Sequence, residues 1–210
     1  MPPGPEGLVR SGADVILQQL FTRLAGPRGP LLLLVSLMGV GVWLVVRDLR
    51  AQQRALQLPV FGLMLAESVG LALVFGVAVS AVTSGLVTPT ALIAQTAVAD
   101  LGVSSRLMLS LGAGLYEELL FRVLLVGTLA LVLRRLVGLR PFGAGLVAAV
   151  VGAVVFSLFH YVGPYGDPFQ TYSFVFRTIA GLALSALFLV RGFGITAWTH
   201  ALYDVFLLMR

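Results

Sequence analysis

The side chains best suited to catalysis in this sequence are a few ionisable residues that lie inside apolar stretches. Both histidines of the chain, His160 and His200, have such surroundings. A third apolar stretch holds the adjacent carboxylates Glu117 and Glu118, followed by Arg122. Ionisable side chains are costly inside a bilayer, so they are rare there and usually functional. Three such groups on three separate apolar segments predict one polar site assembled within a membrane.

The paired carboxylates have a spacing that suits general acid–base chemistry. In an α-helix, Glu118 and Arg122 lie one turn apart on one face, so Arg122 can hold Glu118 ionised and fixed. Glu117 then points about 100° away around the helix and stays available for proton transfer. The alternative is a structural ion pair at a helix end. We disfavour it because the pair lies roughly ten residues, about 15 Å of helix, inside the apolar run.

Each histidine has a partner one helical turn away. Phe156 shares a face with His160, and His200 shares a face with Asp204. Asp204 can fix the tautomer of His200 by accepting a hydrogen bond from it, or both can join a metal site. A histidine at the end of an apolar segment is as often an interfacial hydrogen-bonding residue as a catalytic one. The pairing of His200 with Asp204 on one apolar face is the stronger functional signal.

The three patterns together are more specific than any one of them. Glu-Glu-x-x-x-Arg, Phe-x-x-x-His and His-x-x-x-Asp occur in this order on three apolar segments. The combination resembles the CAAX protease and bacteriocin-processing (CPBP) family of intramembrane proteases over about residues 107–209. The resemblance implies hydrolysis of a peptide bond in a membrane-anchored or lipid-modified protein or peptide. The active-site positions of the family then fall on Glu117, Glu118, Arg122, His160, His200 and Asp204.

The resemblance also implies a division of labour among these residues. Glu117 is the expected general base, and His160 helps to hold the water that Glu117 activates. His200 is expected to polarise the scissile carbonyl. Glu118 with Arg122 would hold the helix in place. Since no serine or threonine has the neighbours of an activated nucleophile, a covalent mechanism is disfavoured.

A requirement for a metal is left open by the sequence. Where this chain has Asp204, family members also have asparagine, whose amide can donate to an oxyanion, whereas an ionised aspartate only accepts hydrogen bonds. Two histidines and a carboxylate form a plausible zinc set with an open water position. Metal-independent activation of water is slightly favoured, and no cofactor is firmly predicted. The candidate ligands are Glu117, His160, His200 and Asp204.

Composition identifies the class of protein. The 210 residues are 59% hydrophobic and 11% charged, whereas a soluble domain carries about 25% charged residues. The net charge of +5 comes from arginine, because the chain has no lysine. These arginines mostly flank apolar runs, which fits orientation in a lipid bilayer and not the binding of nucleic acid. The absence of cysteine excludes disulfides, thiolate metal sites and a cysteine nucleophile.

The expected fold class is all-α, a polytopic transmembrane bundle of about six spans preceded by an amphipathic helix. An interfacial N-terminal segment should cover residues 1–28, its helix about 11–25, and a single transmembrane domain residues 29–210, with the catalytic core at about 107–209. A multi-pass protein of a prokaryotic cell (inner) membrane is expected. A spanning helix needs about 20 apolar residues, which places the spans at about 30–46, 59–82, 107–133, 142–160, 172–190 and 193–209.

Two other functions fit part of the pattern. A transporter or ion- or proton-coupled membrane protein also uses buried carboxylates and histidines, but this chain has no evident inverted repeat. A haem-binding anchor could use His160 and His200 as axial ligands, which would leave Glu117 and Glu118 unexplained.

Two further features have open interpretations. Glu67, within the second predicted span, could face the same polar cavity or make a structural bond to another helix. The aromatic segment that follows His160 and includes Tyr161, Tyr165 and Phe169 is expected to lie at the membrane interface with a turn. It could also gate the access of substrate.

Overall fold

The computed structural model describes residues 12–52, 57–89, 102–162 and 166–209. All regular secondary structure in these ranges is helical, which confirms the predicted all-α class. The helices are α1 (Gly12–Ala25), η1 (Gly26–Arg28), α2 (Gly29–Gln52), α3 (Leu58–Leu86), α5 (Val103–Gly112), η3 (Ala113–Glu117), η4 (Leu119–Gly127), α6 (Thr128–Arg135), α7 (Pro141–Phe159), α8 (Thr171–Arg191) and α9 (Phe193–Leu208).

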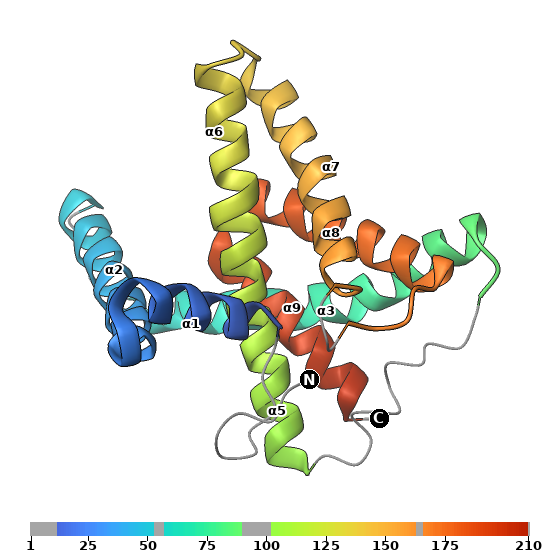
Figure 1. Cartoon of the computed structure of the whole chain (residues 1–210), viewed down its shortest axis with the longest axis horizontal. Coiled ribbons are helices and arrows are strands. Elements are labelled where there is room, and N and C mark those ends of the chain that lie inside the picture. Colours follow the sequence, from blue (N-terminus) through green and yellow to red (C-terminus); the bar gives the residue numbers. More distant parts are fainter. Residues whose placement is uncertain (1–11, 53–56, 90–101, 163–165, 210) are drawn as a thin grey trace.

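Four helical stretches in the described ranges are long and apolar enough to cross a membrane, against about six predicted. They are Gly12–Trp43, Leu58–Leu86, Pro141–Phe159 and Thr171–Arg191. The other two predicted spans are helical but have a different form. Residues 103–135 make one continuous rod in Figure 1 that comprises α5, η3, η4 and α6. The last helix, α9, has 16 residues, or about 24 Å of rise, less than the roughly 30 Å thickness of a hydrocarbon core.

The rod that carries Glu117 and Glu118 is not a regular α-helix. Its central segments, η3 and η4, are π-helical, with i to i+5 hydrogen bonds in place of i to i+4. Such segments are frequent at functional sites, since they change the direction in which side chains leave the helix.

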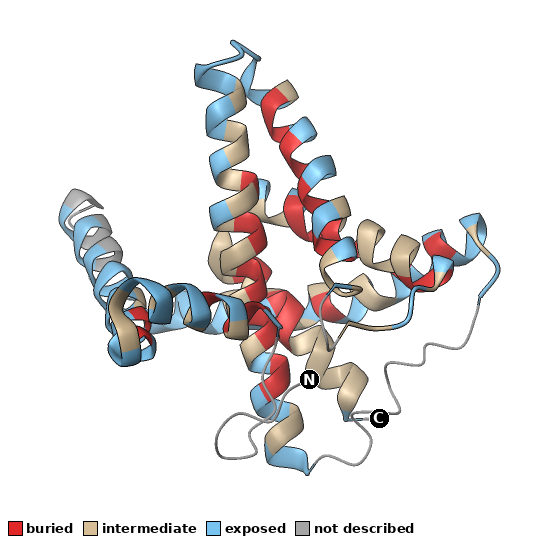
Figure 2. Cartoon of the chain, viewed as in Figure 1, coloured by how far each residue is buried: buried red, intermediate tan, exposed pale blue. Residues whose placement is uncertain are grey.

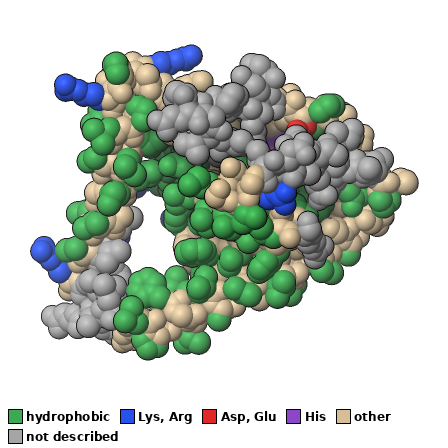
Figure 3. Space-filling model, turned by 90° about the horizontal axis from the view of Figure 1, so that it is seen from below, with side chains coloured by type: hydrophobic (Ala, Val, Ile, Leu, Met, Phe, Trp, Pro, Cys, Tyr) green, Lys and Arg blue, Asp and Glu red, His purple; other side chains and the backbone are tan. Residues whose placement is uncertain are grey.

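The outer surface of the molecule is strongly apolar. In α2, Leu34, Met38 and Trp43 are exposed, and in α3 the same holds for Val74 and Val77. Figure 2 shows exposed residues on the outer faces of the helices and buried ones where the helices meet. Figure 3 shows hydrophobic side chains over much of one face, with arginines along one edge and near its middle. Contact of such a surface with lipid costs little free energy, whereas its contact with water is unfavourable. The chain is therefore an integral membrane protein.

Small residues let the central helices approach one another closely. On α7, six buried alanines and glycines face the neighbouring helices, of which α8 and η4 are two. Gly114 of η3 lies directly on α9, where a Cβ would come 2.5 Å from the Cβ of Ala201 and 2.7 Å from the carbonyl oxygen of Ala197. This close packing brings the rod against the helix that carries His200.

The helix predicted near the N-terminus is present as α1. Its residues Ala13, Asp14 and Leu17 are buried, and the helix packs on α2 and η3. The terminal carboxamide of Gln18 donates to Asp14 over 2.6 Å. The position of α1 at a membrane surface and the division into segments 1–28 and 29–210 stay predictions. Residues 1–11 of the first segment lie outside the described residues.

Candidate active site

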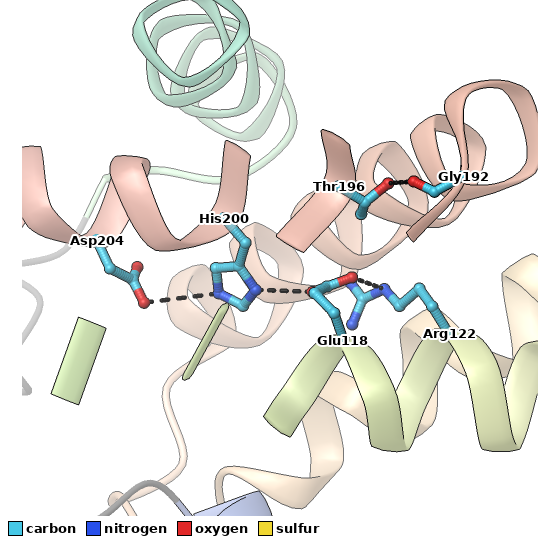
Figure 4. Close-up of polar contacts among 6 residues, drawn as sticks. All are labelled: Glu118, Arg122, Gly192, Thr196, His200 and Asp204. Carbon is cyan, nitrogen blue, oxygen red and sulfur yellow. Dashed lines mark hydrogen bonds and ion pairs between the residues drawn. The ribbon is translucent and has the colours of Figure 1, made fainter. Parts of the chain in front are cut away.

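Glu118 connects the first of the three sequence patterns to the last. It is fully buried, as is Arg122, and its Oε2 lies 3.0 Å from Nε of Arg122. The two groups form an ion pair whose alignment is not that of a hydrogen bond. The other carboxylate oxygen, Oε1, accepts a 2.7 Å hydrogen bond from Nδ1 of His200. Figure 4 shows Asp204, His200, Glu118 and Arg122 in a row across two helices.

Asp204 lies at the other nitrogen of His200. The distance from its Oδ2 to Nε2 is 3.6 Å, which suits an ion pair but is too long for a hydrogen bond. The Asp204 side chain is 22% exposed, in contrast to Glu118. The hydrogen bond that fixes the ring of His200 is therefore made by Glu118, across two helices, and not by Asp204 as the sequence pattern indicated.

His160 is fixed by its own helix. Its Nδ1 lies 2.8 Å from the carbonyl oxygen of Phe156. Because a carbonyl oxygen only accepts, Nδ1 carries the proton. In the neutral ring this leaves Nε2 as an acceptor for a water or substrate proton.

Phe156 is the residue around which the three patterns meet. Its ring centroid lies 4.9 Å from that of His160 and 6.3 Å from that of His200. The guanidinium carbon of Arg122 lies 4.6 Å from the same centroid, within the range of a cation–π contact. One buried aromatic side chain therefore contacts a residue of each pattern.

Glu117 lies one residue before this network, at the end of η3, and is buried. It interacts electrostatically with His200, Asp204 and Arg122. The structure thus gathers five of the predicted residues, together with Phe156, around α7, α9 and the π-helical part of the rod. His160 joins them through Phe156.

Comparison with protein families gave one match. Residues 99–206 match the family model described as type II CAAX prenyl endopeptidase Rce1-like. The chain belongs to this family. All six predicted active-site residues lie within the matched segment, whereas α1, α2 and α3 lie outside it. Comparison with curated proteins and with solved structures gave no match.

The membership confirms the resemblance inferred from the three motifs, and it supports a peptidase of the membrane. Neither the match nor the geometry favours the transporter interpretation.

The metal ligands that the sequence suggested are Glu117, His160, His200 and Asp204. In the four described ranges, no three His, Asp or Glu residues are arranged to hold a metal ion. His200 directs Nδ1 to Glu118, and His160 directs Nδ1 to a carbonyl oxygen. The side chains as arranged do not form a zinc set.

Glu67 lies away from this network. Its carboxylate accepts two hydrogen bonds from Arg191, 2.8 Å from Nε and 2.5 Å from Nη2. The pair joins α3 to the end of α8, next to Gly192, whose φ of 81° allows the turn into α9. Of the two interpretations of Glu67, this geometry matches the structural one.

An ion pair near His160 was not anticipated from the sequence. Arg177 of α8 binds Asp167 through Nη2 and Oδ2, 2.5 Å apart. The signal that could have found it is an arginine inside the predicted span 172–190, ten residues after an aspartate. Tyr165 of the same aromatic segment lies outside the described residues.

Proposed function

We propose that this chain is an intramembrane endopeptidase that hydrolyses a peptide bond of a membrane-anchored, prenylated protein or peptide. The observation that carries the proposal is the junction of the three motifs, with Glu118 between Arg122 and His200 and with Phe156 in contact with Arg122, His160 and His200. The prenylated substrate follows from the description of the matched family.

Glu117 acts as the general base in this proposal. Glu118 is engaged by Arg122 and His200, so Glu117 is the carboxylate that remains for proton transfer. Water held between Glu117 and Nε2 of His160 loses a proton to Glu117 as its oxygen attacks the scissile carbonyl carbon. When the C–N bond then breaks, Glu117 returns the proton to the leaving amine.

His200 stabilises the oxyanion. Each of its ring nitrogens faces a carboxylate, so the doubly protonated ring satisfies both neighbours. Glu118 holds the Nδ1–H over 2.7 Å. Asp204, at 3.6 Å, favours the charge without engaging the Nε2–H in a hydrogen bond. That N–H can therefore donate to the oxygen of the tetrahedral intermediate. No metal is required by this scheme.

The test is cleavage by purified protein in liposomes. The probe is a farnesylated peptide that ends in a cysteine, two aliphatic residues and a free C-terminal residue. We expect the wild type to release the C-terminal fragment, and Glu117→Gln to lower kcat about 100- to 10,000-fold with unchanged folding. Glu67→Gln is the matched control, because it removes a carboxylate outside the network.

Two results would count against the proposal. Wild-type activity in Glu117→Gln would remove the general-base assignment. The peptidase function would be excluded if the wild type cleaved neither the probe nor any membrane protein. The second part is measured by comparing the membrane proteins of cells with and without the gene.

A further inference from the structure

Two buried polar atoms next to His160 have no hydrogen-bond partner among the described residues. They are the hydroxyl oxygen of Tyr161 and Nη1 of Arg177. Tyr161 follows His160 directly, just beyond the end of α7, and Arg177 lies on α8. Buried polar groups are almost always paired, so two adjacent ones without partners indicate a missing ligand.

The two groups belong to one cluster. The guanidinium carbon of Arg177 lies 5.3 Å from the ring centroid of Tyr161. The remaining side of the guanidinium is engaged, because Nη2 donates to Asp167. Asp167 is in turn tied to the catalytic region, since its backbone N–H donates to the carbonyl oxygen of His160 over 2.8 Å. Arg177 is also close enough to His160 to interact with it electrostatically.

The cluster is held in place by the packing of α7 on α8. The hydroxyl of Ser157 donates to the carbonyl oxygen of Phe174 over 2.7 Å, which fixes the first turn of α8 against the end of α7. Tyr161 packs on Phe169 and Phe174. Tyr161 and Arg177 are therefore arranged before any ligand arrives.

The chemistry of the cluster defines what it can bind. A phenol hydroxyl and a guanidinium N–H both donate, so the ligand must accept hydrogen bonds. Asp167 already balances the charge of Arg177, so a singly charged group such as a carboxylate is favoured over a doubly charged phosphate.

We propose that Tyr161 and Arg177 bind the C-terminal carboxylate of the peptide substrate and thereby set the distance of the cleaved bond from the chain end. This inference rests on the proposed peptidase function. A peptide residue extends at most about 3.6 Å, and Tyr161 adjoins His160. A carboxylate held here therefore leaves only a short peptide segment between the chain end and the bond at His160 and Glu117.

The test compares two peptides that differ only at the C-terminus, the farnesylated probe with a free carboxylate and the same peptide as a carboxamide. We expect the wild type to prefer the carboxylate at least tenfold in kcat/KM, because hydrogen bonds to a charged group are strong. Tyr161→Phe removes only the hydroxyl and should abolish most of this preference. Tyr172→Phe is the matched control, since that hydroxyl contacts Ser84 elsewhere.

Arg177 is tested by Asp167→Asn together with Arg177→Gln, which removes both charges at once, so that neither residue stays ionised without its partner. The double variant should cleave the two peptides equally. Equal cleavage of both peptides by the wild type would overturn the inference while the peptidase function stands.

Binding provides a readout that does not depend on cleavage. In Glu117→Gln protein, the carboxylate peptide should bind at least tenfold more tightly than the carboxamide, and Tyr161→Phe should remove the difference. Equal affinities would overturn the inference. The inference would also be overturned if anionic phospholipid vesicles displaced the peptide from protein with Tyr161 but not from Tyr161→Phe. That result would assign the site to a lipid headgroup.

Discussion

At the scale of single residues, most charged side chains of the candidate site are buried and have few partners of opposite charge. Glu118 interacts with both Arg122 and His200, and all three are nearly inaccessible to solvent. In such surroundings, removal of one member leaves the others charged and unpaired, which costs far more than the intact interaction contributes.

Substitution of Glu118 should therefore reduce stability as well as activity. We expect Glu118→Gln to lower the free energy of unfolding by about 3–5 kcal/mol, because Arg122 would stay buried without a counter-charge. Chemical unfolding in detergent micelles measures this loss. Glu67→Gln breaks a half-exposed pair and should have a much smaller effect. Equal losses in the two variants would contradict the central position of Glu118.

Substitution of Phe156 should lower the turnover rate, although its side chain has no acidic, basic or nucleophilic group. The ring positions Arg122, His160 and His200 without taking part in bond making. Misplacement of a catalytic group by about 1 Å can cost on the order of 100-fold in rate. We expect Phe156→Leu to lower kcat at least tenfold in the liposome assay. Phe142→Leu, at an exposed position, should leave kcat unchanged.

At the scale of the elements, the site depends on the contact between the rod and α9. Gly114 of η3 is a point of close approach. Glu117 ends the same π-helical segment, Arg122 lies in η4, and Glu118 lies between the two segments. The backbone of α9 occupies the place where a side chain at position 114 would lie.

A methyl group at this contact should separate the two helices. We expect Gly114→Ala to lower the free energy of unfolding by about 1–3 kcal/mol, as overpacking does in other cores, and to reduce cleavage further by moving His200 away from Glu118. Gly112→Ala is the matched control, because a Cβ at Gly112 meets no atom within 4 Å. Unfolding and cleavage of both variants would be measured side by side, and equal behaviour would argue against a close contact at Gly114.

At the scale of the whole molecule, apolar side chains are exposed on the surface and several charged side chains are buried, which is the reverse of a soluble protein. Apolar side chains of α2 and α3 face outward, while Glu117, Glu118, Arg122 and His200 are buried where α7, α9 and the rod meet. This arrangement places the candidate active site in a protein interior surrounded by lipid.

The absence of cysteine allows this arrangement to be tested by labelling. We expect a cysteine at Val77, exposed on α3, to be protected from a water-soluble maleimide in intact membranes. A cysteine at Val137, in the turn between α6 and α7, should react readily. Rapid labelling of Val77→Cys would show that this face of α3 meets water and not lipid.

Much of this organisation was predictable from the sequence, because ionisable side chains are energetically unfavourable in a membrane and are therefore easy to recognise within apolar segments. Apolar runs are recognisable one by one, and Glu117, Glu118, Arg122, His160, His200 and Asp204 stand out within them. The i, i+4 pair Glu118–Arg122 depends only on local helix geometry, so its contact was expected as well. The catalytic roles of these residues stay predictions.

The tertiary structure decided the partners that lie far apart in the chain. His200 was paired with Asp204 because they are neighbours on one helix, yet its hydrogen bond goes to Glu118, 82 residues away. Glu67 and Arg191, 124 residues apart, meet because α3 packs against α8. Periodicity predicts which residues share a helical face, whereas contacts between helices depend on where small residues such as Gly114 let backbones approach. The sequence by itself therefore determined the membrane class and the candidate site residues, and only the packing of the helices decided how they are connected.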